Sequence, residues 1–432
     1  DISIPAQGAR DVQLVELARV GSTVFFQIPD VPGAPSFEGT LSDDGGTISG
    51  TLTQAGQSIP FEMTRGDRPA EAARAALEGF DEIVEQALYH SLHGYYTGGR
   101  VPWGEVGDYL TAPQLHSAFG VAVATMVREV DALLDAPEPF VLVEVGSGDG
   151  SLLLALCDAL AECAAELYAR LQLWSVERSA PLRQLQLRRL HAHRHRLHWA
   201  KDISELRSAS VRGGILSNEF FDALPVHRLV GWQGEVREIY VDVQGEQFVE
   251  LLGPPSTKRL LEYFSFNGIS LQEGQVAEVS LLVGDWITAA ADKLRSGFLL
   301  TVDYGADTEA LYAPERRSGT LICQHRYRLT NNPYTMVGAQ DITAHVDFGN
   351  LRRCGRAHAL DCHGQTSLMV FLLGYGAAGT GGLIKTDAEA RRMHLALRHL
   401  LFSEIGQTHR VMLQSKGLGL GSIPFGRERL VP

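Results

Sequence analysis

Two patterns of apolar and polar positions divide the chain. Residues 1 to about 66 contain short alternating apolar runs, such as Ser22–Ile28 and Thr47–Thr53, separated by Gly-rich turns. Alternation with a period of two is typical of strands that bury one face, and tight turns join such strands into hairpins. We therefore predict a small antiparallel β-module over residues 1–66.

Apolar positions change to a helical spacing after a polar linker at Arg65–Pro69. From Ala70 onward they recur at intervals of three and four, which predicts an amphipathic helix. These positions are Ala76, Phe80, Ile83, Val84, Ala87 and Leu88. We assign residues 67–138 to a helical N-terminal part of a larger domain.

The rest of the chain alternates apolar strands with longer helical patterns, which predicts βαβ units and a parallel sheet. We place an α/β core over residues 139–373, with an insertion at about 225–296. Within the insertion, the turn residues Trp232–Glu235 separate two apolar runs and predict a hairpin. Residues 374–432 are expected to form a Gly-rich linker and a C-terminal segment that packs on the core.

Composition and charge narrow the classes of protein. Hydrophobic residues make up 45% of the 432 positions and charged residues 21%, as in a globular protein. The sequence contains no run of 18 or more uncharged apolar residues, which argues against a membrane-spanning helix. A net charge of -13 argues against general nucleic-acid binding. Five scattered cysteines suggest free thiols in a reducing compartment, and we expect a cytoplasmic protein.

The segment Phe140–Ser151 carries the strongest local motif. An apolar run ends at Glu144 and leads into glycines at 146, 148 and 150. A dinucleotide fingerprint would place its third glycine at Ser151, whereas Glu-x-Gly-x-Gly-x-Gly is the spacing of class I S-adenosylmethionine (SAM) methyltransferases. The motif therefore favours SAM, whose cationic groups suit a nearby carboxylate. By itself it leaves nicotinamide binding and a structural turn open.

Two further acids follow predicted strands. Glu177 ends the run Leu171–Val176, where a carboxylate can accept hydrogen bonds from both ribose hydroxyls. This position fits SAM or NAD, and a solvated strand end is the structural alternative. Asp202 follows the segment Leu197–Ala200 and is the candidate acceptor for the adenine amino group.

The segment Gly213–His227 groups an amide and two carboxylates near one turn. Asn218, Glu219 and Asp222 could hold a guanidinium by charge-assisted hydrogen bonds, or could cap the following helix. Enzymes that methylate nucleic-acid bases carry an Asn/Asp-Pro-Pro-aromatic tetrad after this strand. The chain has Ser217-Asn-Glu-Phe220 instead, which argues against base methylation.

At this segment the chain resembles a known family, the MidA-like methyltransferases, which comprise bacterial proteins and mitochondrial complex I assembly factors. The resemblance covers residues from about 75 to about 415, with the order of motifs kept. The matching stretches are Ala87-Leu-Tyr89, Gly94-Tyr-Tyr96, Gly107–Pro113, Ser217–His227, Val302–Gly305, Gly319–Leu321 and Gln340–Phe348. Residues 1–66 lie outside it. Their stretches Phe37–Leu41 and Pro60–Arg65 resemble a β-rich module of exported bacterial hydrolases, which leaves export as a minor alternative.

The resemblance implies a class I, Rossmann-like methyltransferase core with helical and β insertions, SAM as the cofactor and protein arginine as the substrate class. It also implies roles for individual residues. The implied cofactor residues are Gly107, Asp108, Glu144, Gly146, Gly148 and Glu177, and the implied methyl-transfer face is Asn218, Glu219 and Asp222. From their positions after the predicted strands, we add Gly150, Asp202 and Asn218 to the cofactor residues. Asp303–Gly305 would end the next core strand, and Asp341, His345 and Asp347 would approach the substrate. One departure is Gln114, where the family commonly has an acid.

These inferences lead to a hypothesis of mechanism. Methyl transfer needs positioning and sometimes a base, so we expect Glu219 and Asp222 to clamp a guanidinium, with His227 or His345 as a proton relay. Two alternatives stay open: a SAM-binding assembly or scaffolding factor with little turnover, and an NAD-dependent oxidoreductase. The expected partner is a protein substrate, and a homodimer is compatible with the sequence.

A basic segment, Arg178–His198, remains without a role in this hypothesis. Its alternating histidines could bind a metal, yet arginines interleave and no thiolate or carboxylate accompanies them. A solvated basic segment and a docking patch for a partner are the alternatives, and the arginines from Arg178 to Arg196 could bind an acidic partner or RNA locally. The scattered cysteines offer no paired zinc motif, so we predict no metal site.

Overall fold

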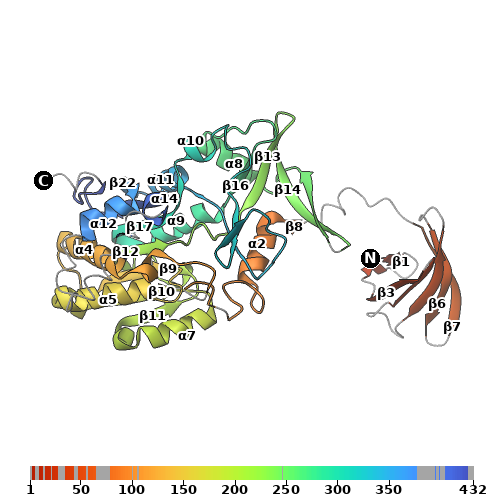
Figure 1. The fold of residues 1–432 in the computed structure, drawn as a ribbon, viewed down its shortest axis with the longest axis horizontal. Coiled ribbons are helices and arrows are strands. Elements are labelled where there is room, and N and C mark those ends of the chain that lie inside the picture. The colour runs from red at the N-terminus through yellow and green to blue at the C-terminus, as the bar shows by residue number, and fades with distance from the viewer. Residues whose placement is uncertain are drawn as a thin grey trace. The chain divides into compact units, whose positions relative to one another are not determined.

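The computed structural model describes most of the chain (Figure 1). The described residues are 78–376 apart from 100, 105, 106 and 246, then 395, 398 and 404–426, and in the N-terminal region 2–4, 9–12, 15–20, 22–27, 35–42, 47–54 and 57–64. The chain forms two compact units, Asp1–Ala76 and Leu77–Pro432. The predicted linker at Arg65–Pro69 lies outside the described residues.

The N-terminal unit consists of antiparallel strands, which confirms the predicted β-module. A pair of strands, β1 (Ile2–Ile4) and β2 (Ala9–Val12), stands beside a five-stranded sheet in chain order. Its strands are β3 (Val15–Val20), β4 (Thr23–Gln27), β5 (Ser36–Leu41), β6 (Thr47–Gln54) and β7 (Gln57–Thr64). The alternating residues Val24, Phe26, Phe37 and Leu52 form a small core, in which the rings of Phe26 and Phe37 stack with centroids 4.7 Å apart.

The second unit is built on a mostly parallel sheet with strand order β11-β10-β9-β12-β17-β23-β22, and this confirms the predicted α/β, Rossmann-like core. The parallel strands are β9 (Phe140–Val145), β10 (Leu171–Val176), β11 (Leu197–Ala200), β12 (Val211–Asn218) and β17 (Leu294–Ala306). Strand β23 (His409–Lys416) runs antiparallel to both β17 and β22 (Asp361–Ser367). A short strand, β21 (Val346–Asp347), also pairs with β17.

Helices cover both faces of this sheet, which explains why β9 is apolar at every position except Glu144. Leu142 packs in the core that includes α4 (Ala118–Leu133), α5 (Ser151–Cys163) and α12 (Leu368–Gly376). Val141 and Val143 point to the opposite core, which includes α9 (Leu282–Lys293) and α11 (Phe348–Ala357). The remaining helical segments of this core are α3 (Ala112–Leu115), α6 (Ala165–Arg170), α7 (Ala180–Arg189), η2 (His191–Arg196), η3 (Ile203–Glu205), α10 (Thr308–Leu311) and α14 (Glu404–Thr408).

The insertion forms a separate antiparallel sheet of order β15-β14-β13-β16, with α2 (Phe80–Tyr89) beside it (Figure 1). Its strands are β13 (His227–Trp232), β14 (Glu235–Gln244), β15 (Gln247–Gly253) and β16 (Val276–Val279), and β8 (Glu78–Gly79) pairs with β14. Trp232 pairs with Glu235 across a two-residue turn, which confirms the predicted hairpin. Helix α8 (Lys258–Asn267) and a third sheet, β18 (Ile322–His325), β19 (Arg328–Thr330) and β20 (Asp341–Thr343), complete the unit.

Two boundaries differ from the sequence prediction. The insertion sheet ends at Val279, and α9 belongs to the core because it packs on β17 and α11 rather than on the inserted strands. At the C-terminal end, β23 is a member of the sheet, between β17 and β22, and not a segment packed on the core. An eight-residue run such as His409–Lys416 does not reveal its pairing partners, because register depends on strands that are distant in the chain.

Among the residues that the structure describes, no helix combines the length and the apolar character needed to cross a bilayer.

The fully buried Leu156 on α5 gives a test of the core. We expect Leu156→Ala to lower the free energy of unfolding by about 2–5 kcal/mol, because the lost side chain leaves a cavity between helix and sheet. All five tryptophans lie between positions 103 and 286, so a urea titration followed by tryptophan fluorescence reports on the second unit alone. The matched control Leu187→Ala removes a 39%-exposed side chain and should change stability by less than about 1 kcal/mol. Equal effects of the two variants would contradict this packing.

Candidate active site

A cavity of about 490 Å³ opens at the carboxyl ends of the central parallel strands. Strand β9 has β10 on one side and β12 on the other, so the order of the strands reverses here. Open α/β sheets bind ligands at such a switch point, outside the carboxyl ends of the strands. The predicted site residues that line the cavity are Glu144, Gly146, Gly148, Glu177, Asp202, Asn218 and Glu219.

The turn between β9 and α5 has a backbone that only glycine adopts readily. Gly146, Gly148 and Gly150 have φ values of +68°, +53° and +81°. A Cβ atom on Gly146 would lie 2.6 Å from the ring of Phe220, and one on Gly148 would lie 3.1 Å from the ring of Trp103. Side chains at Gly146 and Gly148 would collide with these two rings. Because glycine has no side chain, the backbone of the turn can lie next to the cavity.

Glu144 brings a buried carboxylate to this turn. Its Oε2 atom has no hydrogen-bond partner among the described residues, and burial raises the pKa of the carboxyl well above its usual range. Because an unpaired buried carboxylate is costly, the site is suited to a cationic group that restores a partner. The ammonium and sulfonium groups of SAM provide such charges, so the residues present fit this cofactor.

Glu177 directly follows β10, and both of its carboxylate oxygens accept hydrogen bonds from the backbone but can accept more. Its Oε2 accepts a hydrogen bond from the Gly148 N–H at 3.0 Å, and its Oε1 accepts one from the Ser179 N–H at 2.9 Å. An ionised carboxylate has about four acceptor sites, so each oxygen can accept one more bond, such as one from a ribose hydroxyl. Burial raises the pKa of Glu177 to about 7.

Two other lining residues, Asp202 and Gln114, also have structural roles. Asp202 lines the cavity and also caps η3, where its Oδ1 accepts from the Ser204 N–H at 2.8 Å. Gln114 lines it too, and its Nε2 donates to Asp149 Oδ2 at 3.1 Å. An acid at position 114, as the resemblance would suggest, would face Asp149 with a like charge. The amide removes this repulsion.

The loop after β12 holds Glu219 in an uncommon conformation. Its φ is +48°, a left-handed value that is costly for a residue with a Cβ atom. Asn218 Nδ2 donates to Glu219 Oε1 at 3.2 Å. Asp303 at the end of β17 anchors the loop, because its Oδ2 accepts from the N–H groups of Phe220 and Phe221 at 3.2 and 2.9 Å. Burial raises the pKa of Asp303 to about 7.

Aromatic side chains form the wall beside this loop. Tyr89, Tyr96, Trp103 and Tyr109 all line the cavity. The Tyr96 hydroxyl donates to Asp341 Oδ1 at 2.8 Å and lies 3.1 Å from the Tyr109 hydroxyl. Burial raises the pKa of Asp341 to about 6. The stretches that match the family include these tyrosines, but the resemblance implies no role for them.

His409 is a neighbour of Glu219 that the sequence reasoning missed. It is fully buried at the start of β23, and its Nε2 lies 3.4 Å from Glu219 Oε1. Its ring packs on Tyr304, with centroids 3.8 Å apart. The pairing of β17 with β23 sets this contact, since Tyr304 and His409 are opposite each other in the register. A lone histidine 190 positions after Glu219 carried no local signal of this contact.

Several predicted site residues do not line the cavity. Gly150 caps the start of α5, and the buried Asp108 accepts hydrogen bonds from the Tyr95 hydroxyl and the Arg326 N–H. Asp222 is buried, and its pKa is well above the usual range because of burial and of the neighbouring acids Asp303, Glu219 and Asp341. Gly107 is also outside the lining, and His345 borders a separate small cavity. These residues either hold the structure around the cavity in place or lie away from the cavity.

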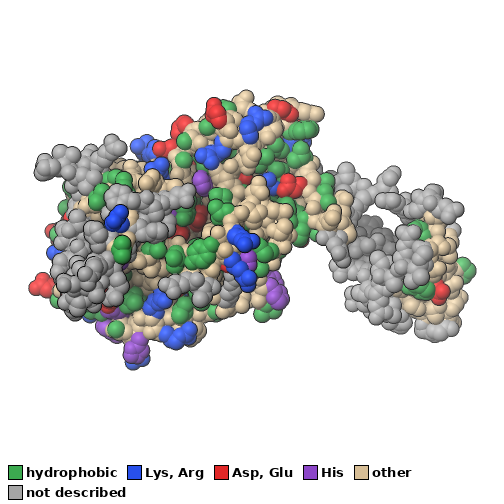
Figure 2. All heavy atoms as spheres, in the orientation of Figure 1, with side chains coloured by type: hydrophobic (Ala, Val, Ile, Leu, Met, Phe, Trp, Pro, Cys, Tyr) green, Lys and Arg blue, Asp and Glu red, His purple; other side chains and the backbone are tan. Residues whose placement is uncertain are grey.

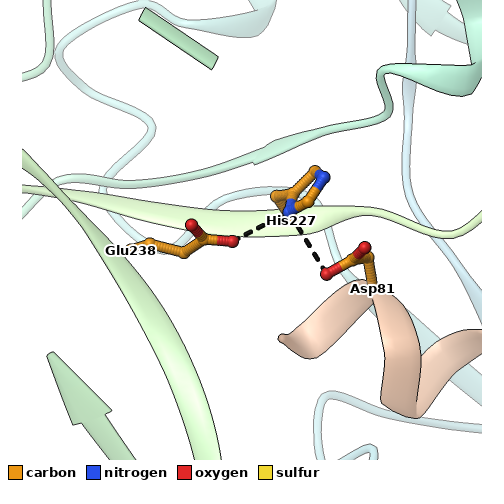
Figure 3. A group of neighbouring side chains, drawn as sticks. All are labelled: Asp81, His227 and Glu238. Carbon is orange, nitrogen blue, oxygen red and sulfur yellow. Dashed lines mark hydrogen bonds and ion pairs between the residues drawn. The ribbon is translucent and has the colours of Figure 1, made fainter. Parts of the chain in front are cut away.

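His227 also lies outside this cavity, in an ion-pair cluster (Figure 3). Its Nδ1 lies 2.8 Å from Glu238 Oε1 on β14 and 3.2 Å from Asp81 Oδ1 on α2. Burial opposes the charge, but the two hydrogen bonds outweigh it and raise the pKa of His227 to about 9. Three such atoms lie close enough together to hold a metal ion, yet an imidazolium donates hydrogen bonds and does not ligate metals.

The sheet order, the glycine turn and the acids at the strand ends define a class I methyltransferase. Residues 119–366, more than half of the chain, match the family model described as "Putative S-adenosyl-L-methionine-dependent methyltransferase". The chain belongs to this family, and SAM is its cofactor. This confirms the resemblance found in the sequence.

Individual relatives are similar to the chain over much of its length. The mitochondrial "Protein arginine methyltransferase NDUFAF7 homolog" of Drosophila melanogaster is 25% identical over 67% of this chain and 70% of that protein. The NDUFAF7 protein of Rattus norvegicus is 26% identical, over 63% of this chain and 65% of its own length. The chain thus spans about two-thirds of these relatives.

Among solved structures, one from Burkholderia thailandensis is described as a "likely methyl transferase" bound to S-adenosyl-homocysteine. It matches with a TM-score of 0.70 and 27% identity, over 83% of this chain and 93% of that chain. A native structure of a protein from the same organism matches with a TM-score of 0.68 and 28% identity over the same shares. These similarities support the fold of the second unit.

The raised pKa of Glu177 generates a prediction for cofactor binding. Only the ionised carboxylate can accept from both ribose hydroxyls, so SAM affinity should fall as the pH drops below about 7, by up to about tenfold per pH unit. Glu177→Gln should bind SAM more weakly at pH 8 and should lose most of this dependence. Isothermal titration between pH 5.5 and 8.5 measures both effects, with the exposed Glu166→Gln as the matched control. A wild-type pH profile in Glu177→Gln would contradict the assignment.

The ion-pair cluster in Figure 3 generates a prediction for stability. The folded pKa of His227 is raised from 6.5 to about 9, so its contribution is complete below pH 6.5 and is lost as the pH rises through 9. At pH 7, His227→Gln should lower the free energy of unfolding by about 2 kcal/mol. The difference from wild type should shrink above pH 9. Urea titrations at pH 6, 7 and 10 test this, with the exposed His191→Gln expected to match wild type at each pH.

Proposed function

We propose that this chain transfers a methyl group from SAM to the guanidinium of an arginine on a protein substrate. The observation that carries the proposal is an excess of carboxylates around the cavity. Six acids line it, Glu85, Glu144, Asp149, Glu177, Asp202 and Glu219, against the two cations Arg178 and Lys201. Arg178 is already paired with Glu85 at 2.5 Å, and Asp149 is paired with Arg189, which leaves four acids against Lys201. A site with this charge balance favours cationic ligands.

The buried acids behind Glu219 support a cation at this end of the cavity. Asp222, Asp303 and Asp341 have pKa values raised by burial, and Glu219 adds to each of these shifts. A guanidinium bound to Glu219 would place a positive charge near this group of acids, and its planar fork of donors suits the Glu219 carboxylate, which lines the cavity. The aromatic side chains that line the cavity, such as Tyr96, can contact the faces of the same group.

Glu219 is the residue we assign to the substrate. When bound, SAM supplies a methyl group on a sulfonium centre that is open to attack by a nucleophile. Glu219 would hold the guanidinium by hydrogen bonds and orient one nitrogen toward that methyl group. As the new N–C bond formed, the bond between the methyl carbon and the sulfonium sulfur would break and leave a neutral thioether. The methylated nitrogen would become more acidic, and Glu219 would accept its proton. His409, 3.4 Å from Glu219 Oε1, is placed to stabilise the carboxylate before transfer.

The arginine specificity draws support from the names of the relatives, which are described as protein arginine methyltransferases at about a quarter identity. For the location we propose the cytoplasm, where SAM is made. All five cysteines are free, which fits a reducing compartment. A homodimer stays a prediction.

Glu219→Gln tests the proposal with little change in shape. We expect it to bind SAM with wild-type affinity and to lower the methylation rate by about 100-fold or more, because the amide cannot accept the proton. The measurement is transfer of labelled methyl groups from SAM to the proteins of a cell lysate, with mass spectrometry to identify methylarginine.

The exposed Glu162→Gln on α5 is the matched control and should keep wild-type activity. Wild-type rates in Glu219→Gln would contradict the assigned role. Absence of methylarginine with the wild-type protein, in spite of SAM binding, would favour an assembly or scaffolding factor instead.

A further inference from the structure

One continuous segment has a charge opposite to that of the rest of the chain. Residues 178–201, which we call the basic strip, contain seven lysines and arginines, four histidines and no Asp or Glu. The chain has 38 Lys and Arg in total, so the other positions hold 31 of them against all 51 Asp and Glu. The strip is therefore a local basic feature on an acidic protein.

The fold places the strip along one edge of the main sheet. It comprises α7, η2 and β11, and β11 is the terminal strand of the sheet. Figure 2 shows histidine and basic side chains along the lower edge of the second unit, where Figure 1 places α7 and β11. Both ends of the strip meet the cavity, since Arg178 and Lys201 line it.

Part of the strip is occupied by contacts within the protein. Arg178 pairs with Glu85, and Arg189 pairs with Asp149. The guanidinium groups of Arg183 and Arg196 donate to backbone carbonyls. These cations hold the strip against the cavity rim and the start of β10, so they shape the surface and are less available to a ligand.

The other cations of the strip face solvent. Arg188, Arg194 and Lys201 are exposed, and their charged groups have no hydrogen bond or ion pair with any described residue. The exposed His191 and His195 stand between them in the chain. Arg188 and Arg194 have no Asp or Glu beside them in the chain, and long cationic side chains of this kind are suited to bind an external anion.

We propose that the basic strip docks an acidic segment of the protein substrate and thereby presents a nearby arginine to the cavity. This inference rests on the proposed function and narrows its substrate class to arginines flanked by Asp and Glu. The strip and the cavity have opposite charges and adjoin at Arg178 and Lys201. An acidic stretch joined to an arginine matches both surfaces, and electrostatic complementarity of this kind sets specificity and association rate.

A nucleic acid matches this arrangement less well. Its backbone carries a charge at every phosphate, so a strand that followed the strip toward the cavity would meet carboxylates such as Glu85 and Glu219. The acidic remainder of the chain would repel the parts of the polyanion beyond the strip. A peptide can change sign within a few residues, which a phosphate backbone cannot do.

Peptide binding tests the proposal independently of turnover. The probes are two labelled peptides with one arginine, preceded either by a run of glutamates or by the same number of glutamines. With the full chain and S-adenosyl-homocysteine, fluorescence anisotropy should show at least about fivefold tighter binding of the acidic peptide, and the difference should shrink in high salt. The double variant Arg188→Glu with Arg194→Glu should lose this preference.

A matched control carries the same change in net charge elsewhere. Lys258→Glu with Arg356→Glu alters exposed cations on α8 and α11 and should keep the preference for the acidic peptide. Equal binding of the two peptides, or an unchanged preference in the strip variant, would overturn the proposal. So would strip-dependent binding of a single-stranded oligouridine that is tighter than that of the acidic peptide. Because binding is measured without methyl transfer, this result and the methylation result can fail separately.

Discussion

Burial of carboxylates without internal cations is the constraint around which this protein is organised. Glu144, Asp222, Asp303 and Asp341 are all buried near the carboxyl ends of the central strands, and their pKa values are raised by that burial. A fold selected for stability alone would place apolar groups or paired charges there. The cationic cofactor SAM supplies part of the missing charge, and the cationic substrate that we propose would supply the rest.

The rest of the structure holds these groups in place. Asp303 uses one oxygen to fix the N–H groups of Phe220 and Phe221, so the loop that carries Glu219 keeps its left-handed turn. Strand β23 enters the sheet antiparallel, between β17 and β22, and brings His409 to Glu219. Tyr96 lies between the cavity and Asp341, because its hydroxyl bonds that acid while its side chain lines the cavity. Segments far apart in the chain thus meet around Glu219 and the buried acids next to it.

Much of the fold and part of the site could be predicted from local patterns. The glycine turn after β9 and the acid that ends β10 were recognisable because their spacing follows from the backbone of a strand, a turn and a helix. His227 was proposed as a proton relay from its proximity in sequence to Glu219, but it lies in an ion-pair cluster with Asp81 and Glu238. Proximity in sequence does not place His227 in the cavity, because the chain enters the inserted sheet at β13.

The sequence by itself determined the α/β class, the antiparallel N-terminal module and the cofactor, since period, glycine spacing and motif order depend on neighbouring residues. The tertiary structure alone decided which acids share a cavity, that His409 rather than His227 or His345 lies beside Glu219, and that the basic strip adjoins the acidic cavity. These facts depend on strand pairing between distant segments. Such pairing is set by the packing of the whole sheet, and local patterns do not encode it.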